Sequence, residues 1–346
     1  MSPLLEAVPN FSEGRDPATV RALVDAIRGV SGVEVLDWSS DPDHHRSVVT
    51  FLGTQTGVEE ASLAAARVAL ERIDLRSHEG VHPRVGALDV LPFVPLEGAT
   101  MDDAVASARR VALGLAEMGV PVFHYGQASD PPGRGLAELR RGGFEALRDG
   151  FPADRRPDVP RGAGQPHATA GVTCVGAREV LLAWNVFVEG VGLEVVRRIA
   201  RDLREVGGGF AGLRALGLHL EEQGRLQVSM NLEDPRRIDP LDVVRAIEEA
   251  VGAEGGRVTE TEVIGMIPEA LVLPAAEDRL HLSGLSPSRL LSHRVSRHLV
   301  ERAAEDSVAL RSALAAAGSD VPVGVRDAAS RLLGTLLGTT TPDADR

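Results

Sequence analysis

Aromatic residues are scarce in this sequence, and cysteine is almost absent. Only 3% of the 346 residues are Phe, Trp or Tyr, so the chain lacks the aromatic platforms on which single-stranded nucleic acids stack. No Lys/Arg-rich run stands out and the net charge is -13, which argues against binding to a phosphate backbone. The single cysteine, Cys174, excludes an intrachain disulfide framework. We therefore expect no nucleic-acid partner.

Long apolar runs are also lacking. Residues 1–15 contain no basic segment followed by an apolar stretch, so we expect no signal peptide. No run is long enough to span a bilayer. These absences predict a cytoplasmic protein with no membrane partner. Because the chain is acidic overall, an anionic small substrate would need a local arginine cluster, for which Arg15, Arg46 and Arg84 are candidates.

The first half of the chain alternates strand-like and helix-like segments. Apolar residues at helical spacing, with Asp16 as N-cap and Pro17 in the first turn, predict a helix over residues 17–30. Two more helices are expected, over residues 59–73 and 101–118. Strands are expected over residues 4–9, 33–36, 47–52, 85–94 and 120–125.

The second half shows a simpler order of elements. Strands are expected over residues 179–188, 213–221, 226–232 and 258–267, with helices over 193–206 and 240–251. The order β-α-β-β-α-β is that of a ferredoxin-like unit. The first half fits the same unit with an inserted loop and an extra α/β element. We predict an α/β (α+β) fold of two similar ferredoxin-like lobes, each an antiparallel or mixed sheet with helices on one face.

These patterns suggest four regions. An N-terminal lobe over residues 1–150 is followed by an interlobe segment over 151–177, a C-terminal lobe over 178–280 and a short helical tail over 281–346. The interlobe segment is rich in Pro, Gly, Arg and Asp, and is either a plain linker or one wall of a small-molecule cleft. The tail, with helices expected over 286–317 and 325–337, is interpreted as a packing appendage or an oligomer contact.

Histidines are the first candidates for chemistry, because their ordinary pKa lets them exchange protons near neutral pH. His124 and His219 fall in expected strands and are interpreted as structural, and three more lie in the tail. The other five lie in polar loops, where catalytic groups concentrate; these are His44, His45, His78, His82 and His167.

The most unusual segment runs from His78 to Asp89. Pro83 restricts His82 to extended conformations, and glycines on both sides allow close backbone approach to a ligand. A metal site is one interpretation, since His78 and His82 are four residues apart, but this spacing serves metals on a helix and Gly80 with Pro83 disfavours one. A purely structural loop is the other alternative to a catalytic one.

Five segments in the same order resemble the glutamate formimidoyltransferase family, with its N- and C-terminal formiminotransferase subdomains. They are Val8–Arg15, Asp43–Phe51, Gly80–Pro95, Gly171–Ala177 and Gln227–Leu232, and the likeness runs from about residue 4 to about residue 275. The resemblance implies transfer of a formimidoyl group from N-formimidoyl-L-glutamate to N5 of tetrahydrofolate, in histidine degradation. It also implies tetrahydrofolate as a co-substrate, no metal, and a homodimer.

The resemblance assigns the catalytic role to His82, as general acid and base, and places folate between two lobes. The folate-contacting stretch maps onto residues 160–171. Arg46 and Arg84 are candidates for the substrate carboxylates, because guanidinium binds carboxylate bidentately, or they are surface ion pairs. Asn10 is a polar contact or only a turn residue. The predicted substrate-binding residues are Asn10, His44, His45, Arg46, Arg84, Gly86, Pro160, Gly164, His167, Thr169 and Gly171.

Three positions depart from the family pattern. Val81 stands where Glu is usual, His45 where Asn is usual, and Phe187 where Asn is usual. A lost polar partner or an added apolar ring near the site would change which donor fits. Two alternatives therefore stay open: a related folate-dependent transferase that uses another one-carbon donor, and a non-catalytic folate-binding protein.

Overall fold

The computed structural model describes residues 3–233, 238–267, 272–273 and 275–276. The two helices and the tail expected beyond residue 280 lie outside the described residues. The first sheet is built from β1 (Leu4–Ala7), β2 (Asn10–Phe11), β3 (Val33–Asp41), β4 (Arg46–Thr54), β5 (Leu88–Pro95), β6 (Val122–Gly126) and β7 (Thr173–Ala177).

β1 and β2 are two parts of one interrupted strand at the centre of this sheet. Both pair antiparallel with β4 on one side and with β5 on the other. Pro9 lies between them and has no N–H to donate to a ladder, so the pairing breaks there and resumes at Asn10. β3 pairs with the far side of β4.

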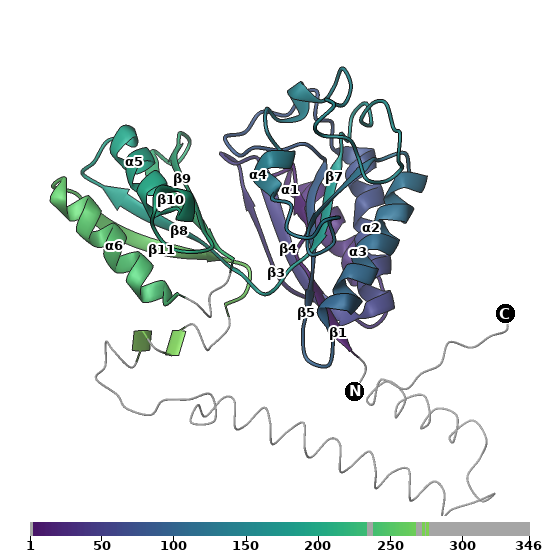
Figure 1. Ribbon diagram of the computed structural model, residues 1–346, viewed down its shortest axis with the longest axis horizontal. Helices are drawn as coiled ribbons and strands as arrows, with labels where there is room; N and C mark the ends of the chain where they lie inside the picture. The colour runs from purple at the N-terminus through teal and green to yellow at the C-terminus, as the bar shows by residue number, and fades with distance from the viewer. Residues whose placement is uncertain (1–2, 234–237, 268–271, 274, 277–346) are drawn as a thin grey trace, which may run out of the picture. The chain divides into compact units, whose positions relative to one another are not determined.

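Three helices cover one face of the first sheet, namely α1 (Pro17–Arg28), α2 (Gln55–Arg72) and α3 (Met101–Glu117); α2 and α3 lie side by side in Figure 1. Asp16 caps α1 by accepting from two backbone amides, as predicted. α2 begins four residues before the predicted start, because the Thr54 side chain accepts from the Gly57 amide. The helices bury a core of Ala, Val, Leu and Phe against the strands.

Read from β1 to β5, the first lobe has the predicted ferredoxin-like order β-α-β-β-α-β. The extra element is α3 with β6 and β7, and β7 lies parallel between β5 and β6. The prediction placed residues 173–177 in the interlobe segment, but they form this inner strand. Their side chains are all buried, as is expected of a strand covered on both faces.

A second, smaller core lies around the strands β5, β6 and β7, and it includes Cys174, Phe123 and Tyr125. It is completed by the segment that follows β6, which contains the short helices α4 (Leu136–Leu139) and η1 (Phe144–Ala146). This segment carries Arg140, the residue directly after α4. Phe151 and Val172, which the prediction assigned to the interlobe segment, also belong to this core.

The second sheet is antiparallel, with the order β11-β8-β10-β9. Its strands are β8 (Leu182–Glu189), β9 (Leu213–Leu220), β10 (Arg225–Leu232) and β11 (Arg257–Ile264). The helices α5 (Leu193–Leu203) and α6 (Pro240–Ala253) pack on one face of it (Figure 1), and the short η2 (Glu205–Gly207) follows α5. This order confirms the ferredoxin-like prediction.

The opposite face of the second sheet is partly polar. Phe187 of β8 lies directly across from Gln227 of β10, so the two side chains share a face. Gln227 is fully buried. No helix among the described residues is long and apolar enough to cross a membrane.

Candidate active site

His82 lies in the loop between α2 and β5 and is half-buried. Its Nε2 lies 3.4 Å from Nη1 of Arg140, and its ring centre lies 5.6 Å from that of His44. Its Nδ1 is buried and has no hydrogen-bond partner among the described residues. The ring is thus held at one nitrogen and unpaired at the other, outside the packed core.

A fully buried carboxylate, Asp89 of β5, organises the arginines beside His82. Its Oδ2 accepts from Nη1 of Arg46 at 2.8 Å and from Nη1 of Arg140 at 3.2 Å. Its Oδ1 accepts from the amides of Val85 and Gly86, at 2.8 and 3.3 Å. Burial alone would raise the pKa of Asp89, but the two arginines and these hydrogen bonds lower it. Asp89 is therefore a permanent anion that holds two cations near His82.

Asn10 joins the same network. Its Oδ1 accepts from Nε of Arg46 at 3.1 Å, and its Nδ2 donates to the carbonyl of Val8 at 2.8 Å. The break between β1 and β2 puts Asn10 opposite Val48 and Val90, between the two strands that carry Arg46 and Asp89. Asn10 and Arg46, both predicted site residues, thus lie in one hydrogen-bond network with Asp89 and Arg140.

His44 connects this cluster to the second sheet. Its Nε2 lies 2.9 Å from Nε2 of Gln227, which donates, and both side chains are buried. The preceding residue, Asp43, accepts from the Glu222 amide at 2.8 Å through its side chain and from the Val81 amide at 3.1 Å through its carbonyl. The loop between β3 and β4 therefore contacts both the His82 loop and the hairpin between β9 and β10.

His45 and Arg84 lie in an adjoining group rather than around the His82 ring. The His45 and His78 rings stack with centres 4.1 Å apart. Arg84 donates to Nδ1 of His78 at 2.9 Å and forms a two-point ion pair with Glu145 at 2.7 and 2.8 Å. All three of its nitrogens are used, so in this arrangement Arg84 fixes the loop instead of presenting an open carboxylate site.

His45 has a left-handed backbone, with φ of 47°. Asn tolerates this region better than most residues, which gives a backbone reason for the Asn that the family resemblance implies here. The His45 ring is held by the carbonyl of Glu79 at 2.9 Å and by Glu13 at 3.3 Å. Burial would raise the pKa of Glu13, but hydrogen bonds from His45 and from the amides of Asp16 and Arg15 lower it to about 2.

Three clustered histidines have lowered pKa values, and burial is the largest cause for each. The pKa of His82 falls well below 6.5, since Arg46, Arg140 and His44 add to the desolvation. Burial lowers the pKa of His44 against the opposing charges of Asp41 and others. The rings of His44, His78 and His82 are therefore neutral at neutral pH.

The predicted residues Gly86, His167, Thr169 and Gly171 form the backbone frame behind the His82 loop. Gly86 and Gly171 pair as an isolated bridge, and His167 and Gly171 exchange two backbone hydrogen bonds of 2.9 Å. The carbonyl of Thr169 accepts from the Leu75 amide at 2.9 Å. Gly171 has φ of 69°, which favours glycine. These residues shape the loop with their main chain.

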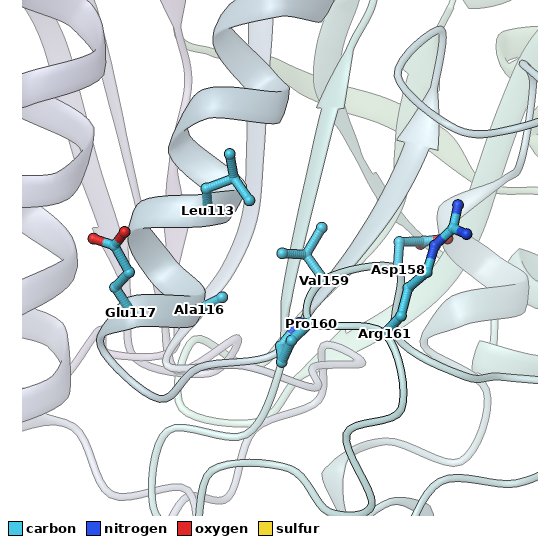
Figure 2. A pocket seen from close by; sticks show the side chains of 7 residues that line it. All are labelled: Leu113, Ala116, Glu117, Asp158, Val159, Pro160 and Arg161. Carbon is cyan, nitrogen blue, oxygen red and sulfur yellow. The ribbon is translucent and has the colours of Figure 1, made fainter.

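Pro160 and Gly164 lie elsewhere on the segment after β6. Pro160 lines a shallow hollow of about 540 Å³ together with residues of α3, as Figure 2 shows, and this hollow contains none of the histidines. Gly164 has open space where a side chain would stand, and its carbonyl accepts from the Phe151 amide at 3.4 Å. Pro160 and Gly164, two residues of the predicted folate-contacting stretch, are therefore not in contact with the His82 cluster.

The positions that depart from the family pattern differ in burial. The Val81 side chain is exposed, while Phe187 is buried under the guanidinium of Arg225, 3.7 Å from the ring centre. Phe187 lies beside Gln227, the partner of His44. An apolar ring is thus present on the sheet face that contacts the histidine cluster.

Sequence reasoning did not single out Asp89, Arg140 and Gln227 as site residues. The sequence context of Asp89 could have marked it as a site residue, since it is a lone acid inside an apolar strand. Gln227 alternates with apolar residues of β10, and Arg140 carries no distinguishing pattern.

Four buried polar atoms without a partner among the described residues belong to this cluster: Asp43 Oδ2, His82 Nδ1, Arg140 Nε and Gln227 Oε1. Such atoms are costly to leave unpaired, so each needs a polar partner such as an ordered water or a ligand atom. Within the described residues, no three His, Cys, Asp or Glu side chains are grouped as metal ligands would be.

Comparison with known proteins agrees with the two-lobe architecture. Residues 4–178 match the formiminotransferase domain, N-terminal subdomain, and residues 183–286 match the formiminotransferase domain. A glutamate formimidoyltransferase of Streptococcus pyogenes is 37% identical over 80% of this chain and 93% of that protein. Another from Thermoplasma acidophilum is 34% identical over 85% of this chain and 98% of that protein. The formimidoyltransferase-cyclodeaminase of Sus scrofa is 39% identical, and 52% of its length is covered. The chain belongs to the formiminotransferase family.

Proposed function

We propose that this enzyme transfers the formimidoyl group of N-formimidoyl-L-glutamate to N5 of tetrahydrofolate, a step of histidine degradation. N5 attacks the amidine carbon and forms the new N5–C bond, giving a tetrahedral adduct. The adduct collapses by breaking the bond from that carbon to the glutamate nitrogen. One proton leaves N5 and one proton reaches the departing glutamate nitrogen, so no oxidant or further reactant is needed.

His82 is the proposed proton carrier between these two nitrogens. Its lowered pKa keeps the ring neutral, so it can accept the proton from N5. The same burial and the nearby Arg46 and Arg140 make the resulting imidazolium a stronger acid than usual. It would then release its proton readily to the departing nitrogen. The unpaired Nδ1 is the nitrogen that would face the substrates.

The substrate-binding roles of Asn10, His44, Arg46 and the stretch 160–171 remain part of this proposal. The single observation that carries the function is the family match over both lobes, and the His82 cluster is the part of the structure whose chemistry fits it. Phe187 and Val81 favour one alternative, a different one-carbon donor, because they replace polar residues implied by the resemblance.

The test is a steady-state assay with tetrahydrofolate and either formimidoylglutamate or formylglutamate. We expect turnover with formimidoylglutamate, and a fall of about 10²–10⁴ in kcat for His82→Asn. His219→Asn is the matched control, since His219 is exposed on β9, and should keep wild-type kinetics. Turnover of formylglutamate alone would establish the other donor. Folate binding without turnover of either would identify a non-catalytic binding protein.

A further inference from the structure

Three arginines surround the His82 loop, and they differ in how much of each guanidinium is already used. Arg84 donates from Nε, Nη1 and Nη2 to His78 and Glu145. Arg46 donates from Nε to Asn10 and from Nη1 to Asp89. Among the described residues, Arg140 donates hydrogen bonds from Nη1 only. Arg140 therefore retains a whole unused edge.

The position of Arg140 is fixed by that one nitrogen. Nη1 lies 3.2 Å from Oδ2 of Asp89, 3.3 Å from the carbonyl of Pro83 and 3.4 Å from Nε2 of His82. Asp89 is itself held by two backbone amides and by Arg46. A guanidinium that is anchored at one nitrogen has little freedom left, so its remaining donors keep a defined direction.

The remaining edge consists of Nε and Nη2. Nε is buried and has no acceptor among the described residues, and no hydrogen bond from Nη2 occurs there. An unpaired buried donor is costly, and more so on a charged group. The Nε and Nη2 donors of arginine are parallel and match the two oxygens of a carboxylate.

Nη1 of the same guanidinium lies 3.4 Å from Nε2 of His82, the ring that handles the departing nitrogen in the proposed reaction. In formimidoylglutamate that nitrogen and the α-carboxylate are attached to the same carbon, so both must lie close to His82 when the proton is delivered. The γ-carboxylate is two carbons farther along the chain. Of the two carboxylates, only the α-carboxylate is tied by the covalent structure to the immediate surroundings of the His82 ring.

We infer that the Nε and Nη2 edge of Arg140 binds the α-carboxylate of the donor, next to His82. The inference rests on the proposed function and assigns one residue to one substrate group. It assigns a carboxylate role to a third arginine, beside Arg46 and Arg84, for which the sequence predicted that role.

The test combines enzyme and substrate variants. Wild type, Arg140→Lys and Arg140→Met are assayed with formimidoylglutamate and with two truncated donors: N-formimidoyl-4-aminobutyrate, which lacks the α-carboxylate, and N-formimidoyl-2-aminobutyrate, which lacks the γ-carboxylate. We expect wild type to favour the full donor over the 4-aminobutyrate by roughly 10–100-fold in kcat/KM. In both Arg140 variants this preference should fall to within about threefold, since the lost pair contributes nothing to either donor.

Two controls separate binding from structure. Arg140→Met also breaks the contacts to Asp89 and Pro83, but this damage lowers kcat/KM equally for all donors and leaves their ratios unchanged. The preference over the 2-aminobutyrate should persist in the variants. Arg141→Met, which removes the neighbouring exposed arginine paired with Asp154, should keep the wild-type preference.

Direct binding completes the experiment. Calorimetric titration with formimidoylglutamate should show weaker binding to Arg140→Met than to wild type by roughly 10-fold or more. An unchanged preference for the α-carboxylate in both variants would overturn the inference while leaving the transferase function intact. If wild type turns over none of the donors but binds formimidoylglutamate through Arg140, the proposed function fails and the inference stands.

Discussion

The histidine proposed to carry protons here has cations, not carboxylates, as its nearest charged neighbours. Arg46 and Arg140 face His82, and the anion that balances them, Asp89, contacts the arginines rather than the ring. A carboxylate in direct contact would raise the pKa of the ring and retain the proton. The observed order lowers the pKa instead, so the ring is neutral before reaction and its imidazolium gives up the proton readily.

His78 gives a prediction about stability at this scale. Burial, with Arg84 nearby, lowers its pKa from 6.5 to about 4, although the bond to the His45 carbonyl opposes the shift. Between these values the unfolded chain binds more protons than the folded one, so stability falls as the pH drops from 6.5 toward 4. The free energy of unfolding of His78→Gln should also fall over this range. We expect that fall to be smaller than the wild-type fall, by on the order of 2 kcal/mol.

Urea unfolding at pH 7.5 and pH 4.5 would measure this difference, at about ±0.5 kcal/mol. His219→Gln, at an exposed position, should show the same acid-induced loss as wild type. An equal loss for wild type and His78→Gln would mean that the buried ring does not control the acid sensitivity.

Among single residues, sequence reasoning found those with distinctive chemistry in a distinctive context. Asn10, His44, Arg46 and His82 were predicted and lie in one network. Arg140 was missed because its role depends on the path of the segment after β6, which no local pattern reveals. Arg84 was found, but its use by Glu145 could not be foreseen, since the two are 61 residues apart.

At the scale of elements, helix and strand positions followed from periodicity, and most errors concern element ends. The early start of α2 is explained by its N-cap. Thr54 caps the helix, so it begins before the first apolar residues from which its start was predicted. The interrupted strand of β1 and β2 was read as one run ending at Pro9, because local pattern cannot tell a break within a sheet from the end of a strand. The parallel strand β7 was hidden by the Pro- and Gly-rich residues before it.

Gly86 supplies a prediction about how the His82 loop enters β5. A Cβ at this position would lie 2.2 Å from the carbonyl oxygen of Val172 and 2.6 Å from that of Leu88. Both are backbone atoms, so Gly86→Ala must push the loop and the start of β7 apart. We expect destabilisation by about 3 kcal/mol and a large fall in transfer activity.

Thermal unfolding of Gly86→Ala beside Gly252→Ala would check this. Gly252 lies in α6 with open space around the added Cβ, so alanine there should leave the stability unchanged or raise it by up to about 1 kcal/mol, with no fall in Tm. A Gly86→Ala protein as stable as wild type would show that the close approach to Val172 is dispensable.

At the scale of the whole chain, residues of both sheets meet at the loop between β3 and β4. Gln227 donates to His44, and the amide of Glu222 donates to Asp43. The two-lobe fold was predictable because each ferredoxin-like unit has its own local pattern. The contact between residues 44 and 227 was not, because no sequence pattern relates positions so far apart. The homodimer and the role of the tail stay predictions.

Gln227→Ala tests the contribution of the second sheet to the site. It leaves Nε2 of the buried His44 without its donor, which costs about 1–3 kcal/mol, and we expect roughly a 10-fold fall in kcat/KM as the loop loses its position. Gln223→Ala on the same hairpin is the control, because its bond to Asp41 is exposed and 3.2 Å long. Equal activity of the two variants would show that the sheets act independently.

The contact between Gln227 and His44 also bears on how the protein is made. All strands of the first sheet lie before residue 178, so their residues leave the ribosome before those of β8 to β11. Nε2 of His44 gains its Gln227 donor only after residue 227 has emerged. A nascent chain stalled between these two points would therefore hold every strand of the first sheet but lack the Gln227 donor to His44.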